Sequence, residues 1–266
     1  MSILEEILAH KSKELQERRK KVSVTSLEES IYFNRPIVSL KTHLQGDDKV
    51  GIISEIKRGS PSQGLINNQI DVEQLSKAYI NAGATALSVL SDYKYFGGTL
   101  EDVQTARKFN SCPILRKEFI IEEYQLIEAK SVGADCILLI AAALPEKRCK
   151  ELAGFAKKFG LDVLLEVHNK EEIDSHLSEA VDIVGVNNRN LHDFTTSIDT
   201  SIALAEYIPD KFVKISESGI THAEHIVKLK KQGFKGFLIG THFMSHTQPD
   251  KACAKLISEV KRLEQL

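Results

Sequence analysis

From residue 50 onward, short apolar runs alternate with amphipathic stretches of helical length. The short runs are apolar at consecutive positions, which is typical of parallel strands covered on both faces. We expect strands at 50–56, 85–90, 113–115, 135–140, 161–167, 182–186, 212–216 and 236–240. Between and after them, apolar residues at helical spacing predict helices at 72–82, 100–109, 124–132, 146–159, 170–177, 201–207, 223–231 and 251–263.

Eight strands that are each followed by a helix predict a single α/β domain, a (β/α)8 TIM barrel. An open doubly wound sheet also alternates strands and helices. It usually carries Gly-x-Gly-x-x-Gly after its first strand, and this sequence has no such motif. Glycines follow several of the predicted helices, as expected of residues that end helices: Gly83, Gly133, Gly160 and Gly233.

The first 48 residues differ from the rest and predict an N-terminal helical extension of a barrel at 49–266. Apolar residues at helical spacing indicate a helix that packs on another part of the chain: Ile3, Leu4, Ile7, Leu8 and Leu15. The basic residues that follow are interpreted as a solvated helix face: Lys11, Lys13, Arg18, Arg19, Lys20 and Lys21. The segment is too short and too polar to form a domain by itself.

The composition indicates an ordinary cytoplasmic protein. The formal net charge is −2, which argues against general binding to nucleic acids or membrane surfaces. No apolar stretch approaches the length of a membrane helix, and Glu5 and Glu6 interrupt any signal-peptide core. No metal-ligand spacing is present, so we expect no metal. The four cysteines are scattered, and we expect them to be buried and reduced: Cys112, Cys136, Cys149 and Cys253.

Charged and polar residues follow five of the predicted strands. Because side chains alternate along a strand, Glu55 and Lys57 share one side, and so do Lys117 and Phe119. The other strand ends carry Glu166, the Asn187-Asn188-Arg189 segment and Glu217. Each alone is compatible with an ion pair or a solvated loop. Together they converge at the carboxyl-terminal mouth, where TIM barrels carry their catalytic groups, and so predict an active site.

The loops after strands seven and eight predict a phosphate site. They contain Ser218-Gly219 and Gly240-Thr241, in the position where barrels often bind phosphate. Glycine lets backbone N–H groups approach an anion, and a helix N-terminus adds a favourable dipole. Ser60, in Ser60-Pro61-Ser62 after the first strand, is a candidate hydroxyl donor from the neighbouring loop.

Several segments resemble the indole-3-glycerol phosphate synthase family. The first is Ile-Ser-Glu-Ile-Lys-Arg-Gly-Ser-Pro-Ser at 53–62. Others follow in the family's order: Leu-Ser-Val-Leu at 87–90, Lys-Tyr-Phe-Gly-Gly at 94–98, Pro-Ile-Leu-Arg-Lys-Glu-Phe-Ile-Ile at 113–121, Asn-Asn-Arg-Asn-Leu at 187–191, Ser-Glu-Ser-Gly-Ile at 216–220 and Leu-Ile-Gly at 238–240. The extension also fits the family, in which such a segment packs on the barrel mouth. Gly59 and the 241–243 segment depart from the usual pattern.

The resemblance implies a cofactor-independent ring closure. The substrate would be 1-(2-carboxyphenylamino)-1-deoxyribulose 5-phosphate, and the products indole-3-glycerol phosphate, carbon dioxide and water, in tryptophan biosynthesis. Other enzymes of that pathway are candidate partners, and the chain would be a monomer or a weak dimer.

Each part of this chemistry has a candidate residue. Lys117 is the first candidate for the acid that protonates the ketone, and Lys57 is the second. Lys57 or Arg189 would hold the anthranilate carboxylate. Glu166 would be the base, or would stabilise positive charge on the ring nitrogen. In the same scheme Glu55 and Glu217 orient the lysines and bind sugar hydroxyls, Asn187 bonds a substrate hydroxyl, and Phe96 and Phe119 form apolar walls.

Three other interpretations remain at this point. A lysine in a barrel mouth can form an imine with a ketose phosphate, as in Schiff-base lyases and aldolases. Phosphoribosylanthranilate isomerase is a related barrel, but its motifs are not matched. The chain could also be a barrel that binds a phosphorylated metabolite without turning it over, although such a barrel is expected to lose charges at the rim.

Overall fold

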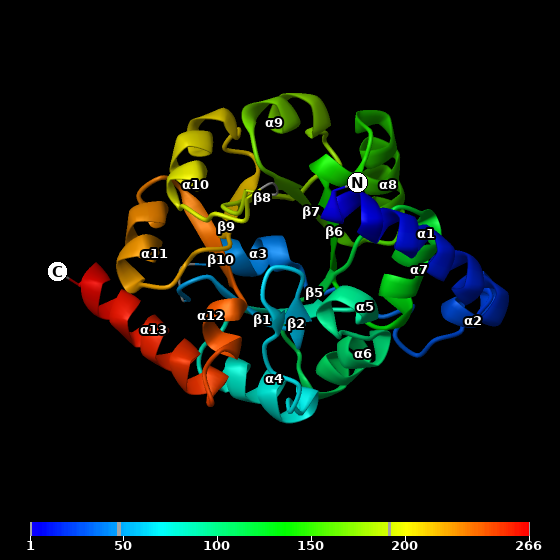
Figure 1. Cartoon of the computed structure of the whole chain (residues 1–266), viewed down its shortest axis with the longest axis horizontal. Coiled ribbons are helices and arrows are strands. Elements are labelled where there is room, and N and C mark those ends of the chain that lie inside the picture. Colours follow the sequence, from blue (N-terminus) through cyan, green and yellow to red (C-terminus); the bar gives the residue numbers. More distant parts are fainter. Residues whose placement is uncertain (1, 47–48, 191–192, 266) are drawn as a thin grey trace.

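Eight parallel strands close into a barrel in this computed structural model, which describes residues 2–46, 49–190 and 193–265. Around the barrel the order is β1-β10-β9-β8-β7-β6-β5-β4 (Figure 1). The strands are β1 (Ile52–Ile56), β4 (Ala86–Leu90), β5 (Ile114–Lys117), β6 (Cys136–Ile140), β7 (Asp162–Val167), β8 (Ile183–Asn187), β9 (Val213–Glu217) and β10 (Phe234–Ile239). The predicted (β/α)8 barrel is therefore confirmed.

Helices surround the barrel and cover the outer faces of its strands (Figure 1). They are α4 (Val72–Asn81), α6 (Leu100–Phe109), α7 (Glu123–Ser131), α8 (Glu146–Lys158), α9 (Lys170–His176), α10 (Asp199–Leu204), α11 (Ala223–Lys230) and α13 (Pro249–Glu264), with short 3₁₀ turns at η1 (Ala141–Ala143) and η2 (Ala205–Tyr207). Because strand side chains alternate, Leu87 and Val89 pack in the large cluster beneath these helices, whereas Ala86 packs inside the barrel.

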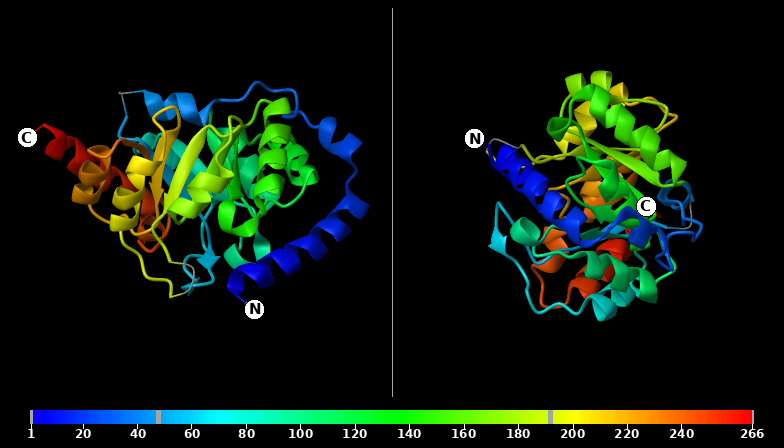
Figure 2. Two further views of the ribbon diagram at one scale, coloured as in Figure 1. Left: turned by 90° about the horizontal axis from the view of Figure 1, so that it is seen from above. Right: turned by 90° about the vertical axis from the view of Figure 1, so that its right-hand side faces the viewer.

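The extension contributes to both ends of the barrel. Its helices are α1 (Ile3–Lys21), α2 (Val24–Glu28) and α3 (Leu40–Gln45). Leu40 and Leu44 of α3 pack with the residues that fill the barrel interior. Helix α1 lies at the opposite end of the barrel (Figure 2). There, Ile3, Leu4 and Ile7 line a cavity. Residues 47 and 48, at the end of the predicted extension, and Leu191 of the fourth motif lie outside the described residues.

The basic run in α1 is only partly a solvated face. Lys13, Lys20 and Lys21 are exposed as expected. Lys11 is completely buried, with its ammonium 2.9 Å from Asp92 and 3.0 Å from Glu118. Arg18 pairs with the buried carboxylate of Glu128 at 2.8 Å. Helical spacing could have placed Lys11 in the buried stripe, four residues after Ile7 and four before Leu15.

Strand β5 ends two residues later than predicted, at Lys117 rather than at 115. The prediction ended it where the apolar run ends, but Arg116 and Lys117 continue the pairing with Val89 and Leu90 of β4. Arg116 is fully buried on the outer face, and its guanidinium lies 2.6 Å from Glu128. A partnered buried charge therefore takes the place of an apolar side chain in this strand.

Besides the 3₁₀ turn η1, four short elements were not predicted. A hairpin formed by β2 (Gly59–Ser60) and β3 (Gly64–Leu65) follows β1, while α5 (Tyr93–Phe96) follows β4 and α12 (Thr241–Met244) follows β10. All are at most four residues long, so they carry no periodic signal. The hairpin explains Gly59, because a Cβ there would lie 2.8 Å from the backbone oxygen of Gly64.

The predictions for the glycines that end helices and for the buried cysteines also agree with the structure. Gly83, Gly133, Gly160 and Gly233 follow helices and have positive φ. At Gly133 a Cβ would also lie 2.4 Å from Cγ of Arg107. All four cysteines are buried and free. Within the described ranges, no helix is long and apolar enough to cross a membrane.

Candidate active site

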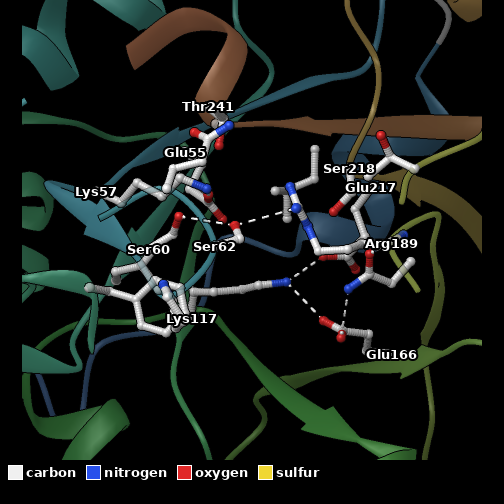
Figure 3. A pocket seen from close by; sticks show the side chains of 18 of the residues that line it. Glu55, Lys57, Ser60, Ser62, Lys117, Glu166, Arg189, Glu217, Ser218 and Thr241 are labelled. Carbon is white, nitrogen blue, oxygen red and sulfur yellow. Dashed lines mark hydrogen bonds and ion pairs between the residues drawn. The ribbon is translucent and has the colours of Figure 1, made fainter. Parts of the chain in front are cut away.

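A cavity of about 370 Å³ opens at the carboxyl ends of the strands. Every catalytic or substrate-binding residue predicted from the sequence lines it: Glu55, Lys57, Ser60, Phe96, Lys117, Phe119, Glu166, Asn187, Arg189, Glu217, Ser218, Gly219, Gly240 and Thr241. Figure 3 shows several of these side chains pointing toward one another across the cavity. The predicted convergence of strand ends on one pocket is therefore confirmed, while the role of each residue remains a proposal.

Lys117 lies between two carboxylates. Its ammonium is 3.0 Å from Oε2 of Glu166 and also pairs with Oε2 of Glu217 (Figure 3). The side chains are 13 %, 7 % and 3 % exposed respectively, so water screens these ion pairs only weakly. Asn187 donates from Nδ2 to Oε1 of Glu166 at 3.0 Å, which fixes the other edge of that carboxylate. Strands β5, β7, β8 and β9 thus each supply one member of a connected group.

The protonation of this group follows from its charges. Burial lowers the pKa of Lys117, but the carboxylates of Glu217, Glu166 and Glu55 outweigh burial and raise it above its ordinary value. Burial raises the pKa of Glu166, but Lys117 and His168 reverse this and hold it well below its ordinary range. Burial, opposed by Lys117 and reinforced by Glu166, raises the pKa of Glu217 to about 7. At neutral pH the group therefore holds a charged ammonium and an ionised Glu166.

Glu217 has one unused oxygen. Its Oε1 is buried and, among the residues that the structure describes, has no hydrogen-bond partner. Gly185 of the neighbouring strand leaves room for this oxygen, because a Cβ at Gly185 would lie only 2.7 Å from it. A buried acceptor without a donor is costly. Oε1 is therefore placed to accept a hydrogen bond from a bound hydroxyl.

A second lysine lies beside its own carboxylate on β1. The ammonium of Lys57 is 2.6 Å from Oε1 of Glu55, as their spacing of two residues predicts. Gly240 makes space for this carboxylate, since a Cβ at Gly240 would lie 2.2 Å from Oε1 of Glu55. The cavity therefore contains two lysines, each partnered by acidic groups.

Arg189 reaches across the mouth from the β8 end. Its guanidinium lies 3.3 Å from Oγ of Ser62, which is 3.4 Å from Oγ of Ser60 (Figure 3). The backbone N–H of Arg189 donates to Oδ1 of Asn187. These contacts bring a cation and two hydroxyls from the β1 and β8 loops to one side of the cavity. Thr241 and Ser218, from the two loops predicted to bind phosphate, also line the cavity.

One wall of the cavity is apolar. The rings of Phe96 and Phe119 lie 6.0 Å apart at 39°. Ile3, Leu4 and Ile7 of α1 extend this wall over the mouth. The arrangement provides an aromatic-sized apolar surface beside the charged group, as required to bind a flat ring next to its reacting atoms.

The sequence interpretation missed His168. The residue follows β7, and its Nε2 lies 3.6 Å from Oε1 of Glu166. Its separation of two positions from Glu166 could have revealed it, by the same alternation that grouped Glu55 with Lys57.

The sequence interpretation also missed the contacts of the residue that follows Lys117. Glu118, the next residue, is fully buried and accepts from Ser91 at 3.0 Å while pairing with Lys11 of α1.

Known proteins of one family are similar to this chain over most of its length. The family model described as indole-3-glycerol phosphate synthase matches residues 4–256. A protein of that name from Bacteroides thetaiotaomicron is 44 % identical over 97 % of this chain and 99 % of its own. One from Laribacter hongkongensis is 38 % identical over 96 % of this chain and 99 % of its own.

Solved structures of lower identity support the fold alone. A mutant tryptophan synthase α-subunit from Pyrococcus furiosus has a TM-score of 0.59 and 18 % identity, covering 80 % of this chain and 98 % of its own. Thiamine phosphate pyrophosphorylase from Pyrococcus furiosus has a TM-score of 0.61 and 16 % identity, covering 85 % and 99 %. From the family match and the long, similar relatives, we conclude that this chain belongs to the indole-3-glycerol phosphate synthase family.

Proposed function

We propose that this chain closes the indole ring in tryptophan biosynthesis. It converts 1-(2-carboxyphenylamino)-1-deoxyribulose 5-phosphate to indole-3-glycerol phosphate, carbon dioxide and water, using its own side chains. The observation that carries the proposal is the Lys117 ammonium held between Glu166 and Glu217 in a cavity with a second lysine and an apolar wall. That arrangement supplies an acid, a base and a surface for an aromatic ring.

Lys117 acts as the acid in ring closure. The ring carbon that bears the carboxylate attacks the ketone carbon, and the ketone oxygen takes a proton as the new bond forms. Lys117 remains charged at neutral pH because Glu217 and Glu166 raise its pKa. Its position at the end of β5, between these carboxylates, supports this assignment. The substrate separates Lys117 from one of them when it binds.

Two cations are available for the anthranilate carboxylate. Lys57 and Arg189 both line the cavity and come from opposite sides of it (Figure 3). Either holds the carboxylate by a charge-assisted hydrogen bond until carbon dioxide leaves. The wall of Phe96 and Phe119 packs on the ring during this step.

Glu166 acts as the base in the final dehydration. It accepts the proton that the methylene carbon beside the ring nitrogen loses, while Lys117 or Lys57 protonates the departing hydroxyl group. Asn187 keeps Glu166 in place and is within reach of a substrate hydroxyl. Glu55 and Glu217 orient the lysines, and the free oxygen of Glu217 binds a sugar hydroxyl.

The phosphate occupies the side of the mouth where the β9 and β10 loops meet the β1 loop. Ser218, Gly219, Gly240, Thr241 and Ser60 all line the cavity there and provide hydroxyl and backbone N–H groups.

Residues 1–48 act as an extension of the barrel, because α1 completes the cavity wall and α3 packs on the interior. The four free thiols favour the cytoplasm as the site of action.

Direct turnover tests this function. Purified protein is mixed with the carboxyphenylamino-deoxyribulose phosphate and a chelator, and indole fluorescence is followed over time. A rise with chelator present is the expected result. A flat trace from folded protein that still binds the substrate would contradict the proposal.

Borohydride should trap no substrate on Lys57 or Lys117, because the ketone is attacked by a ring carbon and not by an amine.

A further inference from the structure

His168 borders the proposed base but takes no part in the steps above. It lies two residues after Glu166, at the end of β7, and its side chain is 12 % exposed. Its Nε2 points toward Oε1 of Glu166 at 3.6 Å, just beyond hydrogen-bonding distance. Catalytic hydrogen bonds are often this long before substrate binds.

The other side of the imidazole is held by Glu172 of α9. Nδ1 lies 3.3 Å from Oε2 of Glu172, and the backbone N–H of His168 donates to the same oxygen at 2.7 Å. A carboxylate at Nδ1 orients the ring and leaves Nε2 for the proton that is exchanged. Nε2 is buried and has no hydrogen-bond partner within the described part of the chain. Such an unsatisfied nitrogen requires an explanation.

His168 also lines a second cavity of about 460 Å³. This cavity is polar, with Glu172, Asn169, Thr195, Ser197 and Thr200 among its described lining residues. Only Asn187 and Arg189 of the described residues line both this cavity and the active-site cavity. A polar space of this size admits water. His168 therefore lies between Glu166 and a route to solvent that bypasses the substrate.

The proposed reaction creates a need for such a route. The ketone oxygen and the departing hydroxyl each take one proton, and the methylene carbon beside the ring nitrogen releases one. The carboxylate leaves as neutral carbon dioxide, so each turnover consumes one proton overall. While substrate fills the active-site cavity under Ile3, Leu4 and Ile7 of α1, that proton needs another entrance.

We propose, resting on the function proposed above, that His168 delivers this proton from the second cavity to Lys117 through Glu166. After Lys117 has given its proton to the ketone oxygen, the imidazolium Nε2–H passes a proton to Oε1 of Glu166. The protonated carboxyl group then turns and passes that proton to the neutral amine of Lys117, whose nitrogen lies 3.0 Å from Oε2 of Glu166. Water in the second cavity reprotonates His168. The recharged Lys117 can act as the acid a second time when the hydroxyl group leaves.

The charges around His168 suit it to this role. Burial lowers its pKa, but Glu172, Glu166 and Glu217 outweigh burial and raise the pKa above its ordinary value. Arg189 lines the same cavity and Lys117 lies across Glu166, so both positive charges act in the opposite direction. The net result is an imidazole that keeps its proton to a higher pH than a free imidazole and loses it as pH rises further.

The test compares the wild type with His168→Asn. The asparagine amide can still donate to Glu172 but carries no exchangeable acid toward Glu166. We expect kcat to fall by about ten-fold or more, with KM and thermal stability unchanged. Added imidazole should restore much of kcat. The alkaline limb of kcat against pH that His168 causes in the wild type should be absent from the variant.

A matched control lies at the end of α9, the helix that carries Glu172. His176→Gln alters a ring that contacts the backbone oxygen of Leu144 and is not among the residues lining either cavity, so kcat should stay at the wild-type value. The inference is overturned if His168→Asn keeps kcat within two-fold of wild type. It is also overturned if activity falls without rescue by imidazole and with the alkaline limb unchanged. His168→Gln replaces the asparagine variant if that protein does not fold. Absence of turnover in the wild type would instead contradict the proposed function itself.

Discussion

The ammonium nitrogen of Lys117 lies 3.0 Å from the carboxylate of Glu166, although their strands, β5 and β7, are separated by β6. The proposed acid and the proposed base are therefore each other's partners before substrate binds. Lys117 lowers the pKa of Glu166, and Glu166 helps to raise the pKa of Lys117. Each residue thus holds the other in the protonation state from which it reacts.

Removal of the acid tests the first half of this pair. Lys117→Ala should lower kcat by about 10²–10⁴, the usual contribution of a general acid. Steady-state turnover measures the loss, and circular dichroism checks that the variant is folded. Lys251→Ala, at an exposed lysine of α13, is the control and should keep wild-type turnover. Near-normal turnover by folded Lys117→Ala would show that another group supplies the proton.

Neutralising the base tests the second half. Glu166→Gln keeps the shape of the side chain but accepts no proton, so kcat should fall by about 10²–10⁴. Substrate affinity, measured by calorimetry, should change much less, because the ring and the phosphate are bound elsewhere in the cavity. Glu171→Gln, at an exposed position of α9, should behave as wild type. If Glu166→Gln loses affinity but keeps kcat, Glu166 binds substrate and is not the base.

Glu217 should make activity depend on pH near neutrality. Its pKa is raised to about 7, so acidification through pH 7 protonates it and removes one of the two carboxylates that hold Lys117. The ratio kcat/KM should therefore fall as pH decreases below about 7, since this ratio reports on the free enzyme. In Glu217→Gln the acidic limb near pH 7 should disappear and the plateau should be lower. An unchanged limb in this variant would assign it to another group.

Lys11 should contribute strongly to stability. Its ammonium is the α1 partner of Asp92 and Glu118, whose side chains are almost completely buried. Lys11→Met leaves both carboxylates in the protein interior without that positive charge. We therefore expect the free energy of unfolding to fall by about 3–5 kcal/mol. Urea denaturation measures this change. Lys13→Met, at an exposed position two residues further along α1, should change the free energy of unfolding by less than about 0.5 kcal/mol. Equal stability of the two variants would contradict the role assigned to Lys11.

The sequence predicted the barrel and the membership of the site because both depend on local patterns. Alternation along a strand places Glu55 beside Lys57, and the carboxyl ends of parallel strands meet at one mouth. The ion pairs between side chains of different strands were not predictable. Lys117 contacts Glu166 and Glu217 on two other strands because the barrel register decides which strand ends lie at equal height.

The partners of the buried charges were the other feature beyond prediction. Arg116 and Lys11 are of residue types that usually lie at the surface, yet both are fully buried. Each is paired there with a carboxylate from another element of the fold. No local pattern identifies those partners. The same reason hid the role of Glu118 in linking α1 to the strand that carries Lys117.

The most direct test of the central claim uses substrate labelled in its carboxylate. Released carbon dioxide and indole-3-glycerol phosphate are quantified together in single turnovers, for the wild type and for the Lys117→Ala/Glu166→Gln double variant. We predict equal amounts of the two products from the wild type. The folded double variant should bind substrate and form neither. Carbon dioxide without indole product from the wild type, or near-normal turnover by the double variant, would contradict the assignment of Lys117 as the acid of ring closure and Glu166 as the base of dehydration.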